Sequence, residues 1–391
     1  MSSIYDRLVE TAQTQSPLAA AQLLVAELRQ AGRYLELFEA LKMLRRLELG
    51  LPAVALDHDA PLTPDQAEAI ERGLLEACRE VGLALIQQGR LQDGWLYMRP
   101  VGDLAAVRQA VDQLEATPEN LDQFLGILVQ EGVDVRRGVR LSLEHRGTCS
   151  TITMMESLVA VRSRKDQQAG VSELVQHVHA ELLENVRQDI ERREGKRPLE
   201  KTLAAILAAR PGFLRDGAYH MDTTHIAATV RLARILDDKE DLRLALDLCR
   251  YGRELNTNYQ YPSDEPFGDL YLMTSYFLSA MLGEHTDASL HQFLQKAESL
   301  DLNEHGTIGI ETYVDLLARI GRPREAMRYL IKKMPPGMRP FGVAPSLLEL
   351  CSQAGDFELM IEQSKAKSDI IGFAAALLQS KSGSLAQATD A

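Results

Sequence analysis

The chain is poor in aromatic residues and in cysteine. Aromatic residues make up only 5% of its 391 residues, and Trp95 is its single tryptophan. Because strands of sandwiches and barrels are enriched in aromatic and β-branched residues, this composition argues against an all-β fold. The cysteines form no CxxC pair, which excludes a zinc ribbon or a thioredoxin-type motif and is typical of a reducing compartment. They are Cys78, Cys149, Cys249 and Cys351.

An excess of positive charge and long apolar runs are also absent. The chain has 56 Asp and Glu against 43 Lys and Arg, which gives a formal net charge of −13. Because binding to nucleic acid or to anionic membranes needs a basic surface, we expect neither as a partner. No window approaches the roughly 18–20 apolar residues of a membrane span, and the N-terminal sequence has no apolar signal-peptide core. The sequence therefore predicts a cytoplasmic protein.

Familiar catalytic and cofactor signatures are missing as well. The sequence contains no GxxxxGK[ST] phosphate loop, no GxGxxG, no HExxH, no GxSxG and no EF-hand loop. Each of these motifs places backbone or side-chain groups around a phosphate, a metal ion or a nucleophile. We therefore expect no nucleotide cofactor.

Apolar residues at helical spacing dominate what is present. Between positions 16 and 32 the leucines form one helix face, and Gly32 is placed to end that helix. Residues 51–63 contain two prolines and no helical period, which predicts a linker. Thr63, followed by proline and aspartate, is typical of a helix N-cap.

A helix–glycine–helix pattern recurs along the chain. The turns fall at Gly32, Gly89, Gly321 and Gly355, and each glycine is followed by a charged residue. The last two glycines are 34 residues apart. This pattern predicts antiparallel helix pairs, each too small to bury its apolar face alone.

The pattern resembles the tetratricopeptide-like α-solenoids. The resemblance is clearest over residues 309–380 and looser over 16–100 and 223–255, and Ala326 is an example of the small residue such repeats place at a helix crossing. It implies an all-α fold built as a right-handed stack of antiparallel helix pairs. Such folds serve as interaction scaffolds more often than as enzymes, and the fold does not settle function.

Changes in pattern along the chain predict four regions. Residues 1–131 form N-terminal helical repeats, and residues 132–268 form a central helical region with irregular, His-containing loops. Residues 269–380 form C-terminal repeats, and residues 381–391 form a disordered tail.

The central region also holds the one strand signal. The alternation of Val139, Leu141 and Leu143 predicts a short strand within residues 132–151, with a glycine break at Gly147. A helix over about 171–194 should follow and end at Gly195.

Histidines gather in this central region, where five of the nine lie within residues 145–225. The tightest group is His220, Asp222 and His225. Imidazole and carboxylate are ligands for zinc, iron and manganese, so these three residues are candidate metal ligands. The alternative is structural, with Asp222 as the N-cap of a helix that starts at about 223 and His225 as an ordinary first-turn residue.

Several other central residues are candidates for the same site. His177, with Glu181 one helical turn on, could approach the metal or lie on a solvated helix face. His145 could take part in the metal site or be structural. Glu144 could take part in catalysis. Cys149 could be a nucleophile or a buried structural thiol. Tyr261, in the loop 256–268, could assist proton transfer or belong to an aromatic lid.

Two functions follow from these features. One is a metal-dependent enzyme of hydrolase, lyase or oxygenase type, acting on a small molecule in the groove of the α-solenoid. The other is a non-enzymatic helical-repeat protein that binds a peptide or protein partner on its concave face. Convergence of the central histidines would favour the enzyme, whereas dispersed, individually hydrogen-bonded histidines would favour the binding protein.

Overall fold

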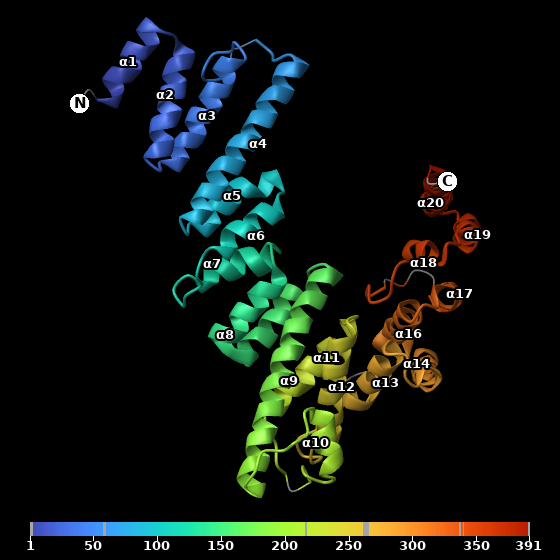
Figure 1. Cartoon of the computed structure of the whole chain (residues 1–391). Helices are drawn as coiled ribbons and strands as arrows, with labels where there is room; N and C mark the ends of the chain where they lie inside the picture. Colours follow the sequence, from blue (N-terminus) through green and yellow to red (C-terminus); the bar gives the residue numbers. More distant parts are fainter. Residues whose placement is uncertain are drawn as a thin grey trace. The chain divides into compact units, whose positions relative to one another are not determined.

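The described part of the chain is predominantly helical (Figure 1). The structure is a computed structural model. It describes side chains and backbone for residues 3–57, 60–215, 217–260, 266–335, 338 and 340–381, and backbone alone for 382–389. Twenty α-helices and no strand are found in these residues, so the all-α prediction is confirmed. No helix in them is long and apolar enough to cross a membrane.

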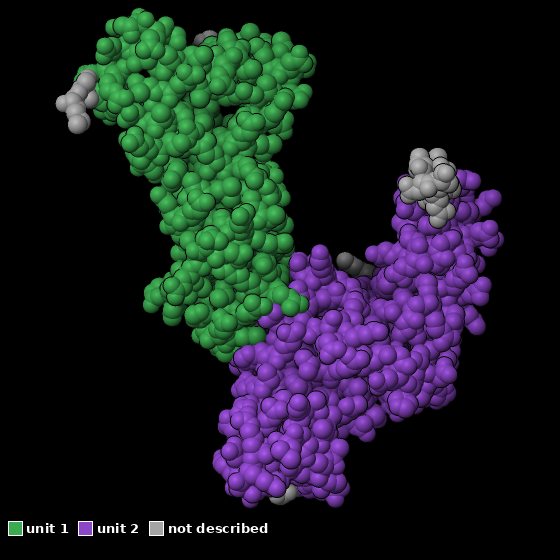
Figure 2. Space-filling model, viewed as in Figure 1, with its two compact units in different colours: residues 1–147, 156–162 green, residues 148–155, 163–391 purple. Residues whose placement is uncertain are grey.

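The chain divides into two compact units, coloured separately in Figure 2. Unit 1 contains residues 1–147 and 156–162, and unit 2 contains residues 148–155 and 163–391. The predicted region boundaries at 131 and 268 do not coincide with this division and stay predictions, as does the disordered tail 381–391.

Unit 1 is built from helices that pack mainly on their neighbours in sequence. Their apolar faces form two clusters, one around Leu37 and Leu85 and one around Met98 and Leu128. The helices are α1 (Ile4–Thr14), α2 (Pro17–Gln30), α3 (Tyr34–Glu48), α4 (Pro64–Gln87), α5 (Leu91–Val101), α6 (Leu104–Asp112), α7 (Leu121–Leu125) with a π-helical turn (Gly126–Gln130), and the first part of α8 (Val135–Met154), followed by a second π-helical turn (Met155–Val159).

Glycines allow two neighbouring helices of unit 1, α4 and α5, to cross closely. A Cβ on Gly94 of α5 would lie 2.6 Å from the carbonyl oxygen of Gly82 in α4. A Cβ on Gly82 would lie 2.9 Å from the carbonyl oxygen of Gly94. Any larger residue at either position would force the helices apart.

Unit 2 is centred on the long helix α9, against which α11 and α12 pack. An apolar cluster around Phe277, Phe293 and Leu317 is the core of the later helix pairs. The helices are α9 (Arg164–Glu194), α10 (Leu203–Ala209), α11 (Thr223–Leu232) with a 3-10 turn (Ala233–Ile235), α12 (Lys239–Glu254), α13 (Leu270–Met281), α14 (Thr286–Ser299), α15 (Leu302–His305), α16 (Ile308–Arg319), α17 (Pro323–Lys333), α18 (Leu347–Ala354), α19 (Glu358–Ala366) and α20 (Ile370–Thr389).

A buried carboxylate holds the segment between α17 and α18 against α16. Glu311 is only 1% exposed. It accepts hydrogen bonds from the backbone N–H groups of Phe341 at 2.8 Å, Gly342 at 2.8 Å and Val343 at 2.9 Å. The hydroxyl of Thr307 donates a fourth, at 2.5 Å. These four hydrogen bonds offset the free-energy cost of burying the carboxylate.

The predicted strand within residues 132–151 is wrong, because Val139, Leu141 and Leu143 lie in α8. Val139 and Leu143 are both buried, and they lie four residues apart on one helix face. The same two residues therefore fit a period of two and a helical period equally well, and packing selected the helix. The break at Gly147 is confirmed, since its backbone is non-helical, with φ +78° and ψ 175°.

Several predicted helix ends are confirmed. The Thr63 side chain accepts from the Gln66 backbone, and the Gln66 side chain accepts in return from the Thr63 backbone, forming a capping box. Gly195 ends α9 in the left-handed conformation. Gly32, Gly89, Gly321 and Gly355 also have positive φ.

Candidate functional site

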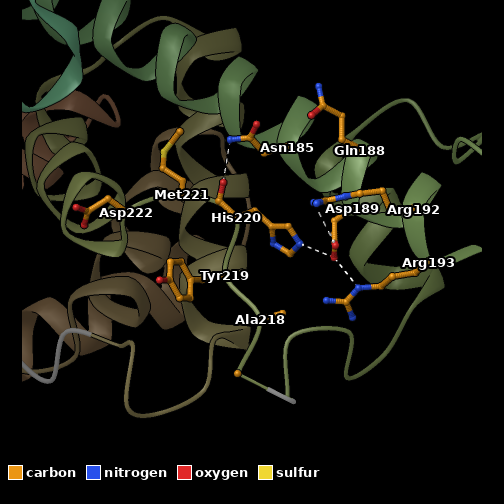
Figure 3. Close-up of a pocket in the computed structure, with 11 residues that line it drawn as sticks. Asn185, Gln188, Asp189, Arg192, Arg193, Ala218, Tyr219, His220, Met221 and Asp222 are labelled. Carbon is orange, nitrogen blue, oxygen red and sulfur yellow. Dashed lines mark hydrogen bonds and ion pairs between the residues drawn. The ribbon is translucent and has the colours of Figure 1, made fainter.

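A cavity of about 550 Å³ lies between the C-terminal half of α9 and the segment 217–222 (Figure 3). On the α9 side its residues are spaced three and four apart, so they form one helix face. They are Asn185, Gln188, Asp189, Arg192 and Arg193. The other wall is a non-helical stretch of consecutive residues from Gly217 to Asp222.

His220 is the most constrained residue of the cavity. Its Nε2 lies 3.1 Å from Asp189 Oδ2, and its Nδ1 lies 2.9 Å from the hydroxyl of Tyr251. Its backbone N–H donates to the same hydroxyl at 3.0 Å, and its carbonyl accepts from Asn185 Nδ2 at 2.8 Å. Phe213 stacks on the ring, with centroids 5.3 Å apart. Segment 217–222 is thereby fixed to both α9 and α12.

Burial determines the protonation state of this group. Burial lowers the pKa of His220, and it outweighs the opposing effect of Asp189. Burial likewise raises the pKa of the Tyr251 hydroxyl. Near neutral pH the imidazole is therefore neutral and the phenol protonated. Since the Asp189 carboxylate can only accept, Nε2 carries the ring hydrogen, and Nδ1 accepts from the Tyr251 hydroxyl.

The Asp189 carboxylate is shared with two guanidinium groups. Arg193 Nε lies 2.7 Å from Asp189 Oδ2, and Arg192 Nη2 lies 3.5 Å from Oδ1. The Arg193 guanidinium also lies over the ring of Phe213, 5.1 Å from its centroid. Both ring nitrogens of His220 are thus occupied, and the ring has no open position for a metal ion or for a proton from a substrate.

The other two predicted metal ligands do not join His220. Asp222 Oδ1 accepts from the backbone of Thr224 at 2.8 Å and from its hydroxyl at 2.7 Å, and these bonds lower the pKa of the Asp222 carboxyl. His225 lies in the first turn of α11. The capping interpretation of Asp222 is therefore confirmed. Within the residues that the structure describes, no three His, Cys, Asp or Glu side chains are placed to hold a metal ion.

The remaining candidates lie apart from the cavity lining. His177 Nε2 is 3.5 Å from Glu181 Oε2 on an exposed face of α9, so the two form an ordinary pair one turn apart. Glu144 and His145 belong to unit 1, Cys149 belongs to unit 2, and all three are exposed. The interpretation of Cys149 as a buried thiol is therefore wrong. Tyr261 lies outside the described residues.

Sequence reasoning missed the residues that hold His220. Asp189 and Arg193 were detectable as part of a polar stripe on one face of α9. Tyr251 carried no such signal, because it is buried among the apolar residues of α12 and resembles any other core residue. An aromatic contact near the expected lid does occur, with the rings of Tyr219 and Tyr259 5.0 Å apart.

Comparison of the chain with protein-family models, with curated proteins and with solved structures finds no match.

Proposed function

We propose that the chain is a helical-repeat binding protein and that the cavity beside α9 holds an extended polypeptide segment of a partner protein. The observation that carries this proposal is the complete hydrogen bonding of His220. The cavity offers polar side chains that can hydrogen-bond a ligand, but both ring nitrogens of its one histidine are already hydrogen-bonded within the protein. The candidate metal ligands of the enzyme hypothesis do not come together among the described residues.

The scaffold supports this proposal. Helices that flank the four turn glycines, such as α2 with α3 and α16 with α17, pack directly against each other. Successive pairs that pack in sequence order are the construction principle of helical repeats, including the right-handed tetratricopeptide-like stack that the sequence resembles. Repeats of this kind expose long surfaces on which a chain segment can lie.

The chemistry of the cavity suits a polypeptide. The amides of Asn185 and Gln188 can exchange hydrogen bonds with a peptide backbone. Tyr219 is 55% exposed, and the Arg192 side chain is 76% exposed. Tyrosine and arginine are the residue types that contribute most often to binding energy at interfaces. An acidic residue of the partner would pair with Arg192, whose distance to Asp189, 3.5 Å, is long for an ion pair.

The test is selection of a displayed random peptide library on the purified full-length chain. Binding of an enriched peptide is then measured by fluorescence anisotropy. We expect Tyr219→Ala and Arg192→Glu each to weaken it roughly tenfold, about 1.4 kcal/mol. Two matched controls, Tyr5→Ala and Arg72→Glu, change an exposed tyrosine on α1 and an exposed arginine on α4 and should leave the affinity unchanged. Absence of saturable binding, or equal losses in the controls, would contradict the proposal.

The competing metal-dependent enzyme has its own readout in the same preparation. Elemental analysis of protein purified without a metal-affinity tag would reveal a stoichiometric zinc, iron or manganese ion. Loss of that ion in His220→Ala would favour the enzyme over the binding protein.

A further inference from the structure

A second cavity of unit 2 is lined by two arginines. It has a volume of about 550 Å³ and shares no residue with the cavity beside α9. Its walls come from the turn after α10 and from the end of α12. They are Pro211, Gly212, Arg215, Arg253, Glu254, Leu255, Asn256 and Thr257.

These arginines differ from most others in the described part of the chain. Acidic residues outnumber basic ones, and nearly every arginine in the described part makes an ion pair or a hydrogen bond through its side chain. Arg215, Arg253 and Arg328 make no ion pair or side-chain hydrogen bond to another described residue. Two of these three line the same cavity.

The fold holds the two arginine-bearing segments together. Asn256 Nδ2 donates to the carbonyl of Arg215 at 3.5 Å, which joins the turn after α10 to the end of α12. The side chain of Arg215 also lies against the backbone of Gly212, where a Cβ would come within 3.1 Å of its Cδ and 3.3 Å of its Nε. Gly212 has a φ of +81°, so both the turn and the position of Arg215 depend on glycine there.

Two arginines that line one cavity favour an anion with several acceptor oxygens. Each guanidinium presents N–H donors in a planar fork that matches phosphate geometry. Two positive charges complement a dianion better than a carboxylate, and the Thr257 hydroxyl adds a donor in the same wall. Glu254 is the one carboxylate among the lining residues, and its negative charge opposes such a ligand.

We propose that this cavity binds a dianionic phosphate group, either as free inorganic phosphate or as the phosphate of a monoester. This site is independent of the polypeptide proposed for the cavity beside α9. The two arginines strengthen phosphate binding, and the Glu254 carboxylate weakens it.

The experiment is calorimetric titration of the full-length chain with inorganic phosphate, phenyl phosphate and acetate at constant ionic strength. We expect saturable one-to-one binding of phosphate, with acetate at least tenfold weaker. Arg215→Gln and Arg253→Gln should each weaken phosphate binding roughly tenfold. Tighter binding of phenyl phosphate than of inorganic phosphate identifies a monoester as the ligand, and equal binding identifies free phosphate.

Two further variants make the result specific. Arg328→Gln changes an arginine that does not line this cavity and should leave the affinity unchanged. Glu254→Gln should tighten phosphate binding, an effect that misfolding cannot produce. The proposal is overturned if phosphate does not bind saturably, if acetate binds equally well, if Arg328→Gln costs as much as Arg215→Gln, or if Glu254→Gln weakens binding. Circular dichroism without phosphate checks that each variant is folded.

Discussion

At the scale of single residues, His220 shows how burial and hydrogen bonding decide what a histidine does. Clustering with Asp222 and His225 in the sequence pointed to a metal, whereas the folded chain gives each of the three different neighbours. Asp222 was predictable as a cap, because capping depends on residues two or three positions away. The bonds of His220 were not, because their partners lie on α9 and α12 and depend on tertiary packing.

Replacement of Tyr251 by phenylalanine tests those bonds. The variant Tyr251→Phe removes one hydroxyl and leaves Nδ1 and the backbone N–H of His220 without their partner in a buried place. We expect the free energy of unfolding to fall by about 1–3 kcal/mol, as measured by urea denaturation. Tyr259→Phe, at a partly exposed tyrosine, is the control and should change stability little. Equal stability of Tyr251→Phe and wild type would show that the hydroxyl is not bound as described.

The lowered pKa of His220 gives stability a pH dependence. In the unfolded chain His220 has an ordinary histidine pKa of about 6.5, above its pKa in the folded state. As the pH falls between these two pKa values, the unfolded chain therefore binds more protons than the folded chain. The contribution of His220 to the free energy of unfolding is therefore present above the unfolded-state pKa and is lost as the pH falls towards the folded-state pKa.

Denaturation at about pH 7.5 and about pH 5.5 measures this dependence. The loss of stability on acidification should be smaller in His220→Asn than in wild type. In His145→Asn, which changes an exposed histidine, it should match wild type. An unchanged pH dependence in His220→Asn would count against a buried neutral imidazole.

At the scale of elements, the close crossing of α4 and α5 reverses the usual effect of replacing a helical glycine by alanine. Alanine in place of a helical glycine usually stabilises a helix by up to about 1 kcal/mol. At Gly94 the new Cβ would meet the backbone of α4, so Gly94→Ala should instead destabilise unit 1 by about 1–3 kcal/mol. At Gly126 a Cβ has open space, so Gly126→Ala should not destabilise. Thermal unfolding of both variants compares the two, and similar midpoints would contradict the crossing.

The segment after α17 depends on one buried side chain. Glu311→Ala removes the acceptor for three backbone N–H groups and for the Thr307 hydroxyl. We expect a loss of about 3 kcal/mol in the free energy of unfolding and faster hydrogen exchange at residues 341–343. Glu325→Ala changes an exposed, ion-paired glutamate and should cost less than about 1 kcal/mol. Unchanged exchange at 341–343 would show that other contacts hold the segment.

Helices were largely predictable from local patterns, and the exceptions have physical causes. Caps, turn glycines and apolar stripes act within one or two helical turns, so Thr63, Gly195 and the glycine break at Gly147 were found. The strand at 132–151 was mispredicted because Val139 and Leu143 satisfy both periods. The Gly82–Gly94 crossing and the Glu311 bonds join distant segments, and a single sequence contains no signal for such pairings.

At the scale of the whole molecule, we propose that the cavity beside α9 binds a polypeptide through Tyr219 and Arg192. The most direct measurement is a charge-exchange cycle with a selected peptide, in which wild type and Arg192→Glu are each titrated with the peptide and with a version whose acidic residue is replaced by arginine. We predict that each single change weakens binding about tenfold and that the two changes together restore most of the affinity. Additive losses, with no recovery in the doubly changed pair, would contradict the claim.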